Sequence, residues 1–195
     1  MQNIAKKEVI ELLWKEIIPR EGELKTEKFL TWLRESDFYK APCSTEFHLN
    51  REGGLAQHSY NVYVLLKEKC IRYNIDVLKT TLIMCGLGHD LCKVNFYKKG
   101  IKNVKEDGRW IQKECYLVED QFPMGHGEKS VSILQNFFML TEEEKLAVRW
   151  HMGMFDPSIH FSYPNGYAFK TAQKKYALIT LLQTADIEAS QILEE

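Results

Sequence analysis

The residues that decide the fold are CGLGHDLCKV at positions 85–94, where a histidine and an aspartate stand side by side after an apolar segment. Three other segments each supply an imidazole: His58 in GGLAQHSYNV, His126 in PMGHGEKSV and His151 in VRWHMG. A further segment, QTADIEAS, places Asp186 on an otherwise apolar helix. A buried lone carboxylate is costly unless it is paired or binds a metal. These segments are therefore expected to converge on a metal site.

Imidazole and carboxylate groups bind iron, zinc, manganese or magnesium in differing degree. Four such side chains make one divalent-metal site, and six make two sites that share a carboxylate. Asp90 is the candidate for the shared ligand, because its two oxygens can reach two ions while His89 ligates only one. Enzymes that hydrolyse phosphate esters commonly use a pair of metal ions.

Together these segments resemble the HD-domain superfamily of metal-dependent phosphohydrolases, whose pattern is His, His-Asp, Asp; the resemblance covers roughly residues 40–190. In that family the first ion takes four of the ligands. A subset of the family adds two histidines that hold a second ion against the bridging aspartate, here His126 and His151. The resemblance thus implies six metal ligands: His58, His89, Asp90, His126, His151 and Asp186.

The resemblance also implies one or two divalent ions per chain, with iron, manganese, zinc, nickel, cobalt or magnesium as candidates. A water that bridges two cations loses a proton near neutral pH, and the resulting hydroxide attacks phosphorus. Asp90 and Lys93 are the expected catalytic residues. Lys93 matches the lysine of the HDxGK sequence in many HD proteins and is expected to reach a phosphoryl oxygen. Cys92 stands where that sequence has glycine.

Three side chains are expected to bind the substrate: Lys93, Lys129 and Ser130. The last two occupy the first turn of a helix that follows Gly125-His126-Gly127. Backbone N–H donors and the positive end of the helix dipole make such a turn a seat for an anion. For Lys93 and Lys129 the alternative is a solvated helix end.

Hydrophobic periodicity predicts a helical chain. Helices are expected over residues 4–18 (with Ile4, Val9, Leu12, Leu13 and Ile17), after Thr26, and over about 55–73. Asp76 is a candidate N-cap for the helix that ends at His89, and Thr141-x-x-Glu144 is a capping box for the helix that ends near His151. A long helix is expected over about 171–193. Pro19 is expected to end the first helix.

Two segments break the helical pattern. Residues 94–119 hold Asp107-Gly108 between β-rich stretches, which predicts an inserted two-stranded hairpin. Its lysines can guide a polyphosphate or nucleic acid, or can simply keep edge strands from aggregating. A loop over 153–170 carries aromatic residues that either wall a substrate pocket or pack the loop down: Phe155, Phe161, Tyr163, Tyr167 and Phe169. His48 is expected near the pocket and His160 in this loop.

Length and composition predict one all-α HD domain over residues 1–195, with N-terminal helices in 1–50 packed on a metal-binding core over 51–193. The net charge of −1 does not indicate a protein that coats nucleic acid, although local contact with nucleic acid stays open. No apolar run is long enough to span a membrane. Five cysteines without a CxxC pair indicate reduced thiols and a cytoplasmic protein.

Three functions fit these observations. The first is a phosphodiesterase or nucleotidase acting on a nucleotide or short oligonucleotide; related exoribonucleases share the GGL-x-x-H motif but carry an oligonucleotide-binding barrel that this chain lacks. The second is a di-iron oxygenase of the same fold that cleaves C–C or C–P bonds. The third is a nucleotide-binding regulator, which predicts lost ligands, whereas every expected ligand position is filled here.

Overall fold

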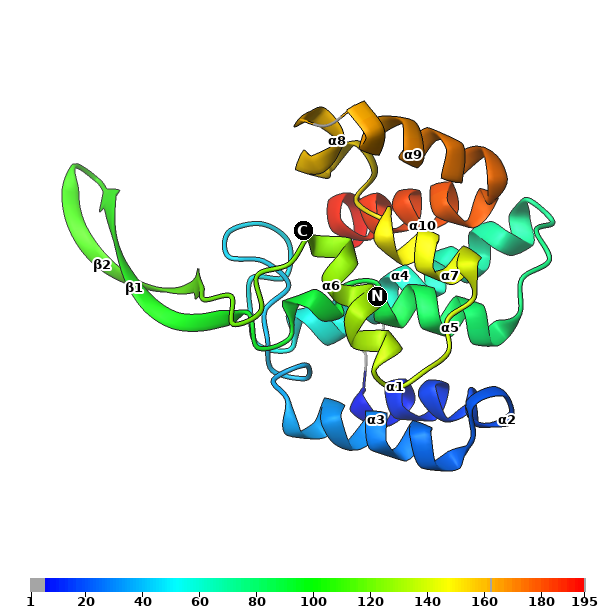
Figure 1. Cartoon of the computed structure of the whole chain (residues 1–195). Helices are drawn as coiled ribbons and strands as arrows, with labels where there is room; N and C mark the ends of the chain where they lie inside the picture. The colour runs from blue at the N-terminus through cyan, green and yellow to red at the C-terminus, as the bar shows by residue number, and fades with distance from the viewer. Residues whose placement is uncertain (1–5, 162, 195) are drawn as a thin grey trace.

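The computed structural model describes residues 6–161 and 163–194, and it is mostly helical with one β-hairpin. The all-α prediction with an inserted hairpin is therefore confirmed. Figure 1 shows a bundle of helices from which the hairpin projects to one side. In chain order the larger helices are α1 (Lys7–Lys15), α3 (Glu23–Glu35), α4 (Gly54–Arg72), α5 (Lys79–Gly88), α6 (His126–Gln135), α7 (Glu142–Arg149), α9 (Tyr163–Lys175) and α10 (Ala177–Glu188).

The centre of the bundle is formed by α4, α5 and α10, with α6 and α7 packed beside them. Helix α5 is buried from Thr81 to Gly88, as expected for a helix that is apolar on most sides. Gly86 allows α4 to approach closely: a Cβ at this position would lie 2.6 Å from the Cα of Tyr63. The sequence CGLG thus places the end of α5, and the His-Asp pair that follows it, against the middle of α4.

The N-terminal helices pack on this centre through Ile10, Trp14 and Ile17, which are fully buried. Trp14 contacts the rings of Phe29 on α3 and Phe138 beyond α6. Of the apolar residues that the sequence placed at helical spacing in the first helix, Ile17 is buried and Leu13 packs against the core, whereas Val9 and Leu12 are exposed. Ile4 lies outside the described residues. Helix boundaries differ as well, because α1 ends at Lys15 and Pro19 lies in the first turn of a short helix, α2 (Ile18–Glu21).

The other helix predictions had mixed outcomes. Helix α4 and the Thr141–Glu144 capping box are confirmed; the box opens α7 with both of its reciprocal hydrogen bonds. Asp76 does not cap α5, which begins after Leu78. The single helix expected over 171–193 is instead α9 and α10, separated at Tyr176, followed by a π-helical turn, η3 (Ala189–Leu193).

The segment predicted as a loop over 153–170 is mostly helical. It contains a short 3₁₀ turn, η2 (Gly153–Phe155), then α8 (Pro157–Phe161) and the start of α9. His160 therefore lies in α8 rather than in a loop. The aromatic residues divide: Phe169 is buried against Trp150, Tyr167 is exposed, and the side chains of Phe161 and Tyr163 lie outside what the structure describes.

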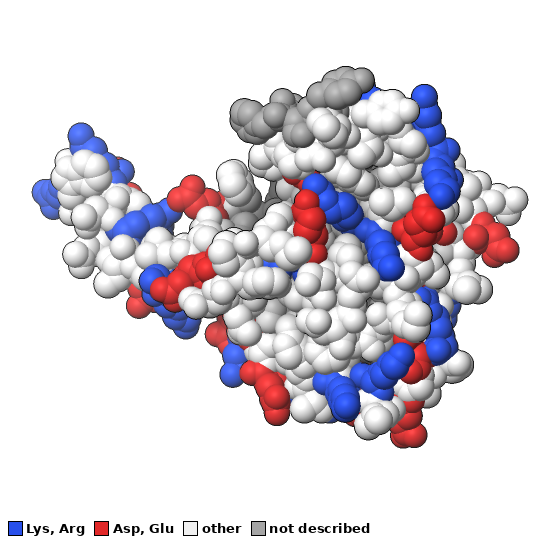
Figure 2. All heavy atoms as spheres, in the orientation of Figure 1, with Lys and Arg blue, Asp and Glu red and all other residues white. Residues whose placement is uncertain are grey.

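The hairpin consists of β1 (Tyr97–Glu106) and β2 (Arg109–Val118), paired antiparallel around Asp107-Gly108. Asp107 and Gly108 both have positive φ, the backbone that a tight two-residue turn requires. Figure 2 shows lysine and arginine side chains along this arm. Several pair with acids: Lys98 with Glu119, Lys102 with Glu46, and Lys113 with Glu106.

No helix among the described residues is both long and apolar enough to cross a membrane. All five cysteines are free thiols.

Candidate metal centre

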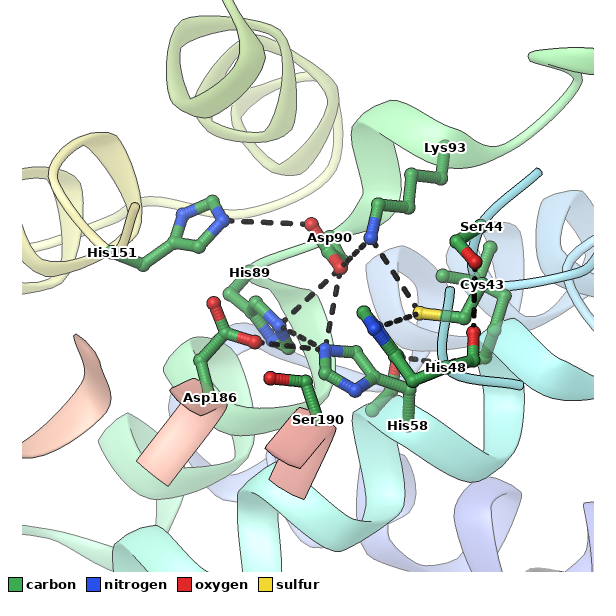
Figure 3. Close-up of polar contacts among 12 residues, drawn as sticks. Cys43, Ser44, His48, His58, His89, Asp90, Lys93, His151, Asp186 and Ser190 are labelled. Atoms are coloured by element: carbon green, nitrogen blue, oxygen red, sulfur yellow. Dashed lines mark hydrogen bonds and ion pairs between the residues drawn. The ribbon is translucent and has the colours of Figure 1, made fainter. Parts of the chain in front are cut away.

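The six predicted ligands come together at the ends and inner faces of five helices. His58 lies on α4 and Asp186 on α10, while His89 caps the end of α5 and Asp90 follows it. His126 begins α6, and His151 lies just beyond the end of α7. Asp90 has left helical geometry, with φ −107° and ψ 19°, so two adjacent residues can face one site. Figure 3 shows His58, His89, Asp90, His151 and Asp186 in this cluster.

One oxygen of Asp90, Oδ2, faces the first group of donors. It lies 3.4 Å from Nε2 of His58 and 3.6 Å from Nε2 of His89. Nε2 of His58 is in turn 3.2 Å from Nε2 of His89 and 3.1 Å from Oδ1 of Asp186. These four side chains therefore direct their donor atoms at a common point.

The other oxygen of Asp90, Oδ1, faces the second group. It lies 2.8 Å from Nε2 of His126 and 3.5 Å from Nε2 of His151. The carboxylate thus stands between two donor groups and turns one oxygen toward each. This is the arrangement that a bridging ligand requires.

Hydrogen bonds on the far side of the rings orient the imidazoles. Nδ1 of His89 donates to the carbonyl of Gly86 at 2.9 Å, and Nδ1 of His151 donates to the carbonyl of Val148 at 2.7 Å. A backbone carbonyl only accepts, so the proton of a neutral ring lies on Nδ1 and Nε2 keeps its lone pair. Both rings are thus held in the tautomer that binds a metal through Nε2.

The protonation states of His89 and Asp90 suit a cation. Burial lowers the pKa of His89 to about 4, so this ring is neutral at neutral pH. Burial acts to raise the pKa of Asp90, but Lys93 and His89 outweigh it and hold that pKa well below its usual value. Burial likewise acts against a charged His58, yet Cys43, Asp186 and Glu194 raise its pKa well above the ordinary value. Without a bound metal, a proton on His58 therefore offsets the negative charge of the nearby carboxylates of Asp186 and Glu194.

One donor atom in the cluster has no hydrogen-bond partner. Among the residues that the structure describes, Nε2 of His151 is buried without a hydrogen-bond partner, with Oδ1 of Asp90 3.5 Å away, whereas its Nδ1 is satisfied. A buried polar atom without a partner costs free energy unless something else fills that role. Together with the mutual distances among the donors, this atom shows that the residues fit a bound divalent ion.

A cavity of about 650 Å³ opens onto the cluster. Asp90, Lys93, His126, His151 and Asp186 all contribute to its wall. The rest of the lining is largely apolar and includes Phe47, Val118, Met152, Phe155 and Ile187. This size and composition are typical of a small-molecule site.

Lys93 lies beside Asp90 and lines the cavity. Its Nζ is 2.7 Å from Oδ2 of Asp90 and 3.5 Å from Sγ of Cys43. Cys43 also contacts Nε2 of His48 at 3.2 Å, and His48 lines the cavity as expected. Lys93 can therefore present a positive charge at the cavity wall beside the candidate ligands.

Lys129 and Ser130 are used elsewhere. The Lys129 ammonium is buried and bonds to Asp120 at 2.5 Å, over the ring of Phe96. The Ser130 hydroxyl accepts a hydrogen bond from the backbone N–H of Cys92. Neither residue is among those that line the cavity. Their assignment to substrate binding stays a prediction.

Glu194 belongs to the cluster and was missed in the sequence. Its carboxylate is buried, and its Oε2 accepts from Nδ1 of His58 at 2.9 Å while Oε1 accepts from Asn61 at 2.8 Å. It orients His58 as the carbonyls of Gly86 and Val148 orient the other rings. The neighbouring residues, Ile192 and Leu193, do not distinguish this glutamate from a surface residue. Its role depends on a contact with His58, which lies 136 positions earlier in the sequence.

Replacing Glu194 with alanine is expected to weaken metal binding by about 10- to 100-fold, the usual effect of losing an outer partner of a metal-binding histidine. Glu194→Gln should recover part of the loss, because its amide oxygen can still accept from Nδ1. Glu188→Ala is the matched control, since Glu188 is partly exposed and pairs with Lys69. Calorimetric titration with Mn²⁺ measures all three, and equal affinity in Glu194→Ala and wild type would contradict the orienting role.

Comparison with protein families gave one match: the model of the HD domain matches residues 55–187. This segment runs from the start of α4 to the end of α10 and contains all six candidate ligands. Searches among curated proteins and among solved structures gave no match.

Proposed function

The chain belongs to the HD-domain family, whose members are generally metal-dependent phosphohydrolases, and we propose that it hydrolyses a phosphate ester of a nucleotide or short oligonucleotide. The observation that carries this proposal is the position of Asp90 between two groups of donors, one for each of its oxygens. The six candidate ligands, His58, His89, Asp90, His126, His151 and Asp186, are proposed to hold one or two divalent ions. Bound ions of this kind activate water and neutralise charge on a phosphoryl group.

The protein's own groups supply binding and orientation. Lys93 is proposed to contact a phosphoryl oxygen, because its ammonium lies at the cavity wall and is already held beside Asp90. Asp90 keeps that ammonium in place and limits its freedom to turn away. Preorganised positive charge of this kind favours the transition state of phosphoryl transfer.

The cavity wall favours a substrate with an aromatic base. Phe47 and Phe155 are exposed side chains that line the cavity, and Tyr97 and Lys93 line it as well. Aromatic faces stack on bases without strong sequence preference. A phosphate near Lys93 and a base against the aromatic wall would together occupy a space of this size.

The proposal is tested by loading the purified protein separately with Mn²⁺ and with Fe²⁺. We expect the manganese form to cleave a bis-aryl phosphodiester and then, in a screen of nucleotides and short RNA, to act on one of these. The iron form is assayed in parallel for oxygen consumption. Oxygen uptake coupled to substrate loss, without cleavage of any ester, would contradict hydrolysis and indicate an oxygenase of the same fold.

A further inference from the structure

The thiol of Cys92 lies among the donors that face Oδ1 of Asp90. Its Sγ is 3.4 Å from both ring nitrogens of His126 and 3.9 Å from Oδ1 of Asp90. Asp90, Cys92 and His126 thus form a group whose donor atoms lie within 4.8 Å of one another. The cysteine stands on η1 (Leu91–Lys93), two residues after the aspartate, and its side chain is buried.

These distances match those between ligands of one metal ion. Zinc binds sulfur at about 2.3 Å and imidazole nitrogen at about 2.0 Å, so tetrahedral neighbours lie roughly 3.3–3.8 Å apart. The separations of 3.4 Å to His126 and 3.9 Å to Asp90 lie close to this range. The ring of His126 is one-third exposed and therefore has room to turn toward a shared ion.

A second observation at the same place points to a ligand. Within the described part of the chain, the buried Nε2 of His151 has no hydrogen-bond partner, and it lies 3.5 Å from the same Oδ1 of Asp90. The rings of His126 and His151 face each other with centroids 5.2 Å apart. A cation at this point would bind the lone pair of Nε2 of His151.

We propose that Cys92 is a metal ligand, acting with Asp90, His126 and His151, and that it makes the second ion position selective for a thiophilic ion such as Zn²⁺. This inference rests on the proposed function and deepens it. Thiolate selects zinc or iron, whereas magnesium and manganese prefer oxygen ligands. A thiolate would add an anionic ligand beside the shared carboxylate of Asp90, and the thiol proton would be released to solvent when the dication binds.

Four protein ligands leave the proposed hydrolysis possible, because zinc accepts a fifth ligand during reactions. Near the first position, Cys43 forms a donor group with His48 and His58, whereas the donor groups that contain His89 and Asp186 include no thiol. The two positions are therefore expected to differ in metal preference, the second being the more thiophilic.

Cobalt substitution tests the inference directly, because a thiolate ligand gives Co²⁺ an intense charge-transfer absorption in the near ultraviolet. Metal-free wild-type protein titrated with Co²⁺ should develop this band, and Cys92→Ser should lack it. Cys43→Ser is the matched control: Cys43 is also buried, and its sulfur contacts His48 in a separate donor group with His58. A band that survives in Cys92→Ser but disappears in Cys43→Ser would overturn the assignment.

Metal competition gives a second measurement. Cys92→Ser should lower zinc affinity at one position by about tenfold or more, and change manganese affinity by less than about threefold. X-ray absorption of zinc-loaded wild type, which needs no variant to fold, should show a sulfur neighbour. Two bound Co²⁺ ions without a charge-transfer band or a sulfur neighbour would refute the Cys92 ligand and leave the proposed function standing; no metal binding at all would refute both.

Discussion

Asp90→Ala is expected to abolish turnover and to empty both ion positions, because each oxygen of this carboxylate faces a different group of donors. Losing an outer partner of a ligand costs up to about 100-fold, so loss of the shared ligand should cost more than that. His126→Ala, in contrast, should leave one ion bound. Elemental analysis after gel filtration counts the ions, and initial rates with the phosphodiester give the loss of activity.

A carboxylate that does not bridge would give a different pattern. Asp90→Ala would then keep one ion per chain, or His126→Ala would keep two. Asp76→Ala is the matched control, since Asp76 is an exposed aspartate outside the helices and should change neither quantity. Circular dichroism of each variant is needed, because Lys93 loses its charge partner at 2.7 Å when Asp90 is removed.

Gly127→Ala is expected to destabilise the protein by about 3 kcal/mol, the upper part of the usual range for overpacking. A Cβ at this position would lie 2.1 Å from the carbonyl oxygen of Arg149 and 2.7 Å from its carbonyl carbon. Both are backbone atoms, so no side chain can rotate out of the way and α6 must move from the end of α7. Because His126 and His151 stand beside these two contacts, the second ion position should be lost as well.

Urea unfolding of the metal-free protein measures the stability, and metal analysis shows which position remains. Gly166→Ala serves as control, since the described residues that its Cβ would meet are limited to Ile159, at an ordinary 3.5 Å. Alanine is favoured over glycine inside a helix by about 1 kcal/mol, so this control should be neutral or slightly stabilising. A Gly127→Ala protein as stable as wild type, with both ions retained, would contradict the close approach of α6 and α7.

Local features of the fold were predictable from the sequence where the cause is local. The Thr141–Glu144 capping box and the Asp107-Gly108 turn depend on residues within four positions of each other, and both are present. The first helix shows the limit of such reasoning. Its buried face is Ile10, Trp14 and Ile17, whereas Val9 and Leu12 are equally apolar but exposed, because the position of Phe29 and Phe138 decides which face is covered.

The six candidate ligands could be named from the sequence because imidazole and carboxylate groups stand out in apolar segments. Only the tertiary structure shows which oxygen of Asp90 faces which histidines, that Glu194 orients His58, and that Lys129 bonds to Asp120 outside the cavity lining. It likewise shows Cys92 beside His126. The physical reason is that the sequence states which side chains can bind a metal, but not how far apart their donor atoms lie. Those distances depend on how α4, α5, α6, α7 and α10 pack against one another.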